Sequence, residues 1–75
     1  MKDLINEVEK YGKEMYSYPV HEDVFNTGED EPFFESVYAG EAIVYQYAEK
    51  EYEIITYNEN SEKYDEGTKR IKQLK

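Results

Sequence analysis

The side chains of this chain that are able to do chemistry are mostly carboxylates and phenols. Its 75 residues include eighteen Asp and Glu, nine Tyr and one histidine, but no cysteine. Because there is no thiol, and because Ser17, Ser36 and Ser61 lie in no nucleophile elbow, nucleophilic catalysis has no support. We therefore expect a protein that is not an enzyme and that carries no cofactor.

His21 is the only histidine of the chain, the residue type best suited to proton exchange at neutral pH, and it lies beside Glu22 and Asp23. A proton carrier or metal ligand is conceivable, but a solvated loop histidine is the better interpretation, since no second histidine or glycine-rich phosphate loop accompanies it. The stretch from Glu22 to Glu35 has oxygen ligands but not the alternating spacing of an EF-hand. Weak divalent-ion binding is the most it predicts, with no dedicated metal site.

The acidic residues are concentrated in the middle of the chain. The formal net charge is −9, and residues 18–41 hold seven carboxylates without a single Lys or Arg. Residues 67–75, in contrast, hold four cationic residues and no acidic one. Repulsion among like charges destabilises a compact state, so this concentration predicts a functional role beyond solubility.

The carboxylates alternate with aromatic residues, which predicts that ordered structure holds them in place. Glu51 and Glu53, for example, would lie ~6.6 Å apart on one strand face, at twice the strand rise. A DNA duplex also presents regularly spaced negative charges. The pattern therefore predicts an acidic array able to occupy a groove built for phosphates, with these candidate contact residues: Glu22, Asp23, Glu29, Asp30, Glu31, Glu35, Glu49, Glu51, Glu53 and Glu59.

The nine tyrosines support an alternative function. So many phenols are difficult to bury in a small domain with every hydroxyl satisfied, and tyrosine is enriched at interface cores. A tyrosine-anchored interaction module, with Tyr45 or Tyr52 as a central anchor, is therefore the second hypothesis. In that case the acidity would serve only solubility.

The segment Ala42–Tyr57 predicts the central element, a β-hairpin with strands 42–48 and 51–57 and a turn at Glu49-Lys50. This register pairs Tyr45 with Ile54. One face would carry Ile43, Tyr45, Tyr47, Tyr52 and Ile54, and the other Val44, Gln46, Glu51, Glu53 and Ile55.

Two helices are expected to flank this hairpin. The first covers Asp3–Tyr16, because Leu4, Val8, Tyr11 and Met15 follow a helical stripe. The second covers Ser61–Leu74, where acidic residues precede basic ones in the order that favours the helix dipole. The whole chain, residues 1–75, is then a single α+β domain.

The segment 18–41 is open to three interpretations. Pro32 suits the start of a short helix over Pro32–Ala39. Alternatively, Phe33–Tyr38 is a strand joined to the hairpin by a tight turn at Ala39-Gly40, which gives a three-stranded meander. A single helix from Phe34 through Tyr52 also fits the aromatic spacing, although Gly40 and the β-branched residues oppose it.

In size, charge, lack of cysteine and alternation of acidic and aromatic residues, the chain resembles the small phage-encoded host-takeover and DNA-mimic proteins. These inhibit host DNA-binding proteins such as the histone-like nucleoid protein. The resemblance implies a basic DNA-binding partner, no direct contact with nucleic acid and action in the host cytoplasm, away from membranes. The small core and surplus of tyrosine further predict a homodimer.

Overall fold

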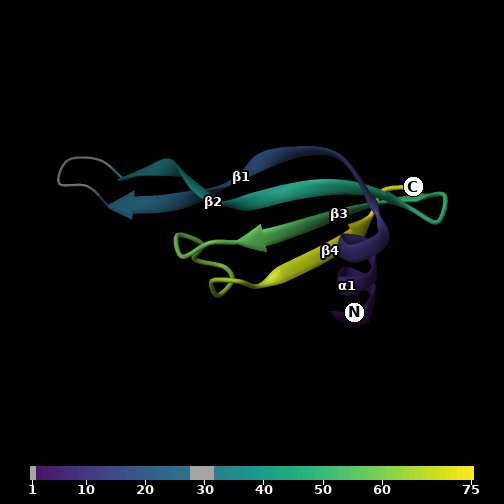
Figure 1. Ribbon diagram of the computed structural model, residues 1–75. Coiled ribbons are helices and arrows are strands. Elements are labelled where there is room, and N and C mark those ends of the chain that lie inside the picture. The colour runs from purple at the N-terminus through teal and green to yellow at the C-terminus, as the bar shows by residue number, and fades with distance from the viewer. Residues whose placement is uncertain (1, 28–31) are drawn as a thin grey trace.

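The computed structural model describes residues 2–27 and 32–75, in which one helix packs against a meandering antiparallel sheet (Figure 1). Each strand pairs with its neighbour in sequence, so the order across the sheet is β1-β2-β3-β4. The N-terminal helix and the meander confirm the expected α+β class, and the sheet has more strands than expected. The elements are α1 (Lys2–Tyr11), β1 (Lys13–Thr27), β2 (Pro32–Tyr47), β3 (Lys50–Tyr57) and β4 (Lys69–Gln73).

Helix α1 forms because its apolar residues recur on one side. Of the stripe predicted from the sequence, Val8 is buried, but Tyr11 is 66% exposed and Met15 lies in β1. Ile5 and Val8 on this side are buried. The helix ends at Tyr11, and the amide of Gly12 donates a hydrogen bond of 2.8 Å to the carbonyl of Val8. The predicted extension to Tyr16 is wrong, because the chain from residue 13 onward pairs with β2 instead.

The β2–β3 hairpin is present, but its turn lies one residue earlier than predicted. Ala48 and Glu49 form the turn with positive φ values of 52° and 66°, while Lys50 already belongs to β3. Two residues of this conformation match the right-handed twist of the strands. Tyr45 consequently pairs with Tyr52 rather than with Ile54.

A register change of two residues keeps every side chain on its face, since strand side chains alternate with period two. The predicted division of the hairpin into two faces is therefore confirmed. We call the side that α1 covers the helix face; it carries Ile43, Tyr45, Tyr47, Tyr52, Ile54 and Ile71. The opposite side is the open face, with Val44, Gln46, Glu51, Glu53 and Ile55.

Segment 32–38 is a strand, so the helix over Pro32–Ala39 and the long helix Phe34–Tyr52 are both wrong. The strand assignment for Phe33–Tyr38 is confirmed, but the chain does not turn at Ala39-Gly40. It continues straight through β2, and the register against β1 is irregular there, between Val20 and the following residue. A local bulge replaces the expected turn, because β1 pairs with β2 on both sides of this point, from Lys13 to Thr27.

No helix forms over Ser61–Leu74, so that prediction is wrong. Residues 58–68 form a loop, and β4 pairs with the edge of β3 so that Ile71 faces Ile54. Gly67 adopts a φ of +85°, which is incompatible with a right-handed helix. Pairing with β3 satisfies an otherwise open strand edge and adds Ile71 to the core, which an isolated charged helix could not match.

Candidate interaction surface

The largest feature outside the core is a two-stranded arm, made of residues 21–27 of β1 and 32–38 of β2. The last pair between β2 and β3 joins Gly40 to Tyr57. Beyond that pair β2 continues with only β1 beside it, so the arm projects past the rest of the sheet (Figure 1).

One face of the arm carries two aromatic pairs. Phe25 and Phe34 meet edge to face with ring centroids 5.3 Å apart, and His21 and Tyr38 do so at 5.9 Å. Phe34 is 71% exposed and Phe25 is 56% exposed. Asp23 lies between the pairs on the same face, because it is two residues from each along β1. We call these five residues the arm stripe; His21 is thus a strand residue, not the loop residue expected.

The predicted acidic contact residues do not form one continuous patch. Glu51 and Glu53 share the open face as predicted, whereas the Glu49 turn lies at the opposite end of the sheet from the arm (Figure 1). Asp23, Glu35, Glu49 and Glu59 are exposed, Glu51 and Glu53 are half-buried, Glu22 is buried, and Glu29, Asp30 and Glu31 lie outside the described residues.

Glu53 is held in place by a tyrosine. The hydroxyl of Tyr18 on β1 donates a short hydrogen bond to its carboxylate across the open face. This bond, helped by partial burial and by the carboxylate charge, raises the pKa of Tyr18 to about 12. The phenol therefore stays protonated and able to donate to Glu53 throughout the physiological range.

Two further carboxylates are fixed in the same way, and sequence reasoning missed both. Tyr38 donates to Glu41 at 2.6 Å, and Tyr47 donates to Glu7 of α1 at 2.9 Å. Each bond raises the pKa of its tyrosine. Tyr38 and Glu41 are only three residues apart, which is a weak signal in the sequence. Tyr47 and Glu7 are forty residues apart and meet only because α1 packs on the sheet, so the sequence carried no signal for them.

Glu22 has a structural role instead of the predicted contact role. It is only 7% exposed, and its carboxylate accepts bonds from the Ser61 hydroxyl at 2.7 Å and from the Glu62 amide at 3.0 Å. These bonds, led by that from Ser61, lower its pKa despite the opposing effect of burial. Glu22 thus anchors the 58–68 loop to β1. Because it is buried, the prediction that Glu22 is a partner-contact residue is corrected.

This anchor predicts a pH-dependent contribution to stability. Since the pKa of Glu22 is lower in the folded chain than its ordinary value of 4.5, its contribution is complete above that value. It is then lost as the pH falls through the folded pKa. In thermal unfolding, Glu22→Gln should lower Tm at pH 7, and the difference from wild type should shrink steadily below the ordinary pKa. A difference independent of pH would contradict the role of the charge.

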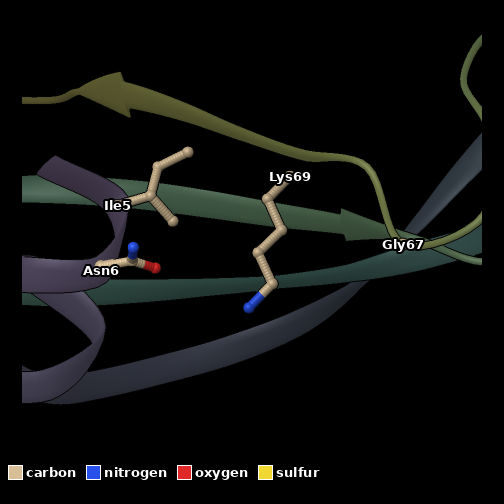
Figure 2. Close-up of a pocket in the computed structure, with 4 residues that line it drawn as sticks. All are labelled: Ile5, Asn6, Gly67 and Lys69. Atoms are coloured by element: carbon tan, nitrogen blue, oxygen red, sulfur yellow. The ribbon is translucent and has the colours of Figure 1, made fainter. Parts of the chain in front are cut away.

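Several cationic residues lie on β4, the edge strand opposite β1. Lys69 forms a salt bridge of 2.7 Å with Glu9 of α1. Beside it lies an open hollow of about 270 Å³ between α1 and the start of β4, lined by Ile5, Asn6, Gly67 and Lys69 (Figure 2). An adjoining hollow shares Ile5 and Lys69 and extends along β4 to Arg70 and Ile71.

Among the residues that the structure describes, no three His, Asp or Glu side chains gather in a way that would hold a metal ion. Within the same residues, no helix is long and apolar enough to cross a membrane.

Comparisons with protein-family models, with curated proteins and with solved structures find no match to this chain.

Proposed function

We propose that this protein is a non-enzymatic acidic inhibitor. It binds a basic, DNA-binding host protein and occupies the surface that would otherwise hold nucleic acid. Its place of action would be the bacterial cytoplasm, and its partner a protein of the histone-like nucleoid type.

The observation that carries this proposal is the set of carboxylates fixed by tyrosine hydroxyls. Glu7, Glu41 and Glu53 each accept a hydrogen bond from a phenol. A phenol neutralises no charge, so each carboxylate keeps its charge while losing conformational freedom. Because ordering flexible side chains opposes association, charges that are already ordered bind at a lower entropic cost.

The charge density limits how far the imitation extends. The net charge of −9 over a molecule 52 Å long corresponds to one charge in roughly 6 Å. A duplex carries about one in 1.7 Å. The whole surface is therefore no copy of DNA, and the proposal concerns local groups of carboxylates, such as Glu51 and Glu53 on the open face.

The test begins with capture of partners from a bacterial lysate on the immobilised chain, elution by a salt gradient and identification by mass. We expect a DNA-binding protein that elutes at raised salt, since the attraction is between charge arrays. The purified partner should then lose duplex DNA as this chain is added. A partner without a nucleic-acid site, or one that still binds DNA unchanged, would refute the proposal.

A pair of charge-matched variants locates the contact. Glu49→Gln with Glu51→Gln should slow association with the captured partner and flatten its salt dependence, because charges that steer encounter are removed. Asp65→Asn with Glu66→Gln removes the same charge from the 58–68 loop beside the cations of β4. This second variant should associate at nearly the wild-type rate; equal effects would mean that only net charge matters.

The tyrosine-anchored module remains the alternative, but with different anchors. Tyr45 and Tyr52 are each only 7% exposed and belong to the core under α1, so neither is available as an anchor. Tyr16 is 57% exposed on the open face and Tyr11 is 66% exposed at the end of α1. If Tyr16→Ala weakened capture of the partner far more than the Glu49 and Glu51 changes, this alternative would replace the mimic.

A further inference from the structure

The chain exposes more surface than a compact protein of its mass. Its accessible area is 5728 Å² for 9.0 kDa, whereas a compact monomer of that mass would expose about 4,900 Å². Its radius of gyration is 15.1 Å, against about 11 Å for a compact domain of this length. The excess area resembles the ~800 Å² that each partner buries in a standard protein interface.

Two surfaces of the chain are complementary in charge and in apolar character. The arm stripe combines exposed aromatic rings with the carboxylate of Asp23. The hollows beside β4 combine an apolar floor, Ile5 and Ile71, with the cationic side chain of Lys69. The hollows lie at the edge of the core and the arm stripe lies beyond it, so one chain cannot join its own arm to its own β4.

Both surfaces also lie on the helix face of the sheet. Ser17 of β1 pairs with Ile43 of the helix face, and His21, Asp23 and Phe25 follow it at even spacing along β1. Because β2 has one extra residue at the irregularity after Val20, Tyr38 and Phe34, which pair with His21 and Phe25, lie on this same face. Phe34 and Ile43 are nine residues apart on β2, ~30 Å at ~3.3 Å per residue, and Ile43 aligns through Ile54 with Ile71. A twofold axis midway between Phe34 and the row of Ile43, Ile54 and Ile71 would place the arm stripe of one copy on the β4 hollows of the other.

We infer that two copies of this chain pair helix face to helix face, with the arm stripe of each in the β4 hollows of the other. Such an interface is isologous and closes at two copies. The rings of Phe25 and Phe34 cover Ile5 and Ile71. Asp23 meets Lys69, whose ammonium has three donors, of which Glu9 accepts one.

The charges select β4 over a second arm as the binding site. Two arms brought together would oppose carboxylates without a Lys or Arg on either, since none occurs between Lys13 and Lys50. Lys69 of β4, on the helix face, supplies the missing cation. This assembly leaves Glu51 and Glu53 on the open face of each copy, turned away from the interface, whereas Tyr38, which donates to Glu41, belongs to the arm stripe and becomes covered.

Sedimentation equilibrium of the purified chain over a wide concentration range tests the inference. We expect a dimer for the wild type and at least a tenfold rise of the dissociation constant for Phe34→Ala, as for a central aromatic anchor. Phe33→Ala is the matched control: Phe33 is 49% exposed but lies on the opposite face of the arm. Its dissociation constant should stay near that of the wild type.

A charge exchange identifies the contact itself. Asp23→Lys and Lys69→Glu should each weaken the dimer when studied alone. Their equimolar mixture should associate more tightly than either, because one contact is then native and the other joins the two introduced side chains, whose charges are again opposite. Both changes are at exposed sites and an exposed ion pair contributes little to folding, so circular dichroism should show native strand content.

Each outcome decides the matter. A wild type that is monomeric at high concentration overturns the inference, and so does a dimer indifferent to Phe34→Ala and Asp23→Lys. A dimer that both changes weaken, but that the mixture does not restore, overturns the assignment of Lys69 as the acceptor. Restoration in the mixture, with Phe33→Ala unaffected, supports the reciprocal arrangement.

Discussion

Replacing Ile54 with alanine is expected to unfold a large fraction of the molecules at 25 °C. Ile54 is only 2% exposed and lies in the middle of β3, in the cluster that joins the sheet to α1. Removing a buried isoleucine typically costs about 2–5 kcal/mol, part of it for the cavity left behind. A domain of this size has only ~3–5 kcal/mol of net stability, so the loss is comparable with the whole.

The neighbouring residue provides the control. Ile55 is next to Ile54 in β3, is half-buried and faces the open side, away from α1. Ile55→Ala changes the same atoms at a site that can collapse or take up water, so its cost should be clearly smaller. Urea denaturation followed by circular dichroism measures both. Equal losses for the two variants would show that α1 does not stabilise the sheet through Ile54.

The hairpin shows how much of this fold the sequence was able to specify. Alternation along Ala42–Tyr57 identified both strands and both faces correctly, because burial of one face follows directly from period-two patterning. The turn position failed by one residue. Ala48 and Glu49 lack the usual Asn-Gly preference for positive φ, so local composition offered no signal for it.

The C-terminal segment shows why the remainder was not predictable from local rules. The charge order and the i,i+4 pairs in residues 61–74 favour a helix only in an isolated peptide, by a few tenths of a kcal/mol per pair. Pairing with the open edge of β3 and burial of Ile71 against Ile54 contribute more. Gly67 adopts a φ of +85°, which a right-handed helix cannot contain and which glycine reaches without strain.

In the candidate surface too, features set by local spacing were predictable and features set by long-range contacts were not. Residue type and spacing correctly placed Glu51 and Glu53 on one face. Burial of Glu22 depends on a loop some forty residues away, and the bond between Tyr47 and Glu7 depends on the packing of α1. Such long-range contacts have no periodic signature, so composition predicted an acidic surface but not which carboxylates are fixed on it.

Replacing Gly40 with valine is expected to disrupt the junction between the sheet and the arm. A Cβ at this position would lie 2.4 Å from the carbonyl oxygen of Thr56 and 3.1 Å from the Cα of Tyr57. Both are backbone atoms of β3, which side-chain rotation cannot move away. Overpacking of this kind typically costs about 1–3 kcal/mol, a large share of the stability of a small domain.

Gly67 is the comparison that separates steric overlap from backbone conformation. A Cβ at Gly67 would meet no atom within 4 Å, but its φ of +85° strains any ordinary residue. Gly67→Ala should therefore cost roughly 1–2 kcal/mol through conformation alone, and Gly67→Asn should recover part of this because asparagine tolerates that region. Gly40→Asn should recover nothing, because the obstacle there is the β3 backbone. Urea denaturation of the four variants decides the point: recovery by asparagine at position 40 would mean that Gly40 is required for its flexibility and not for the close approach of β2 and β3.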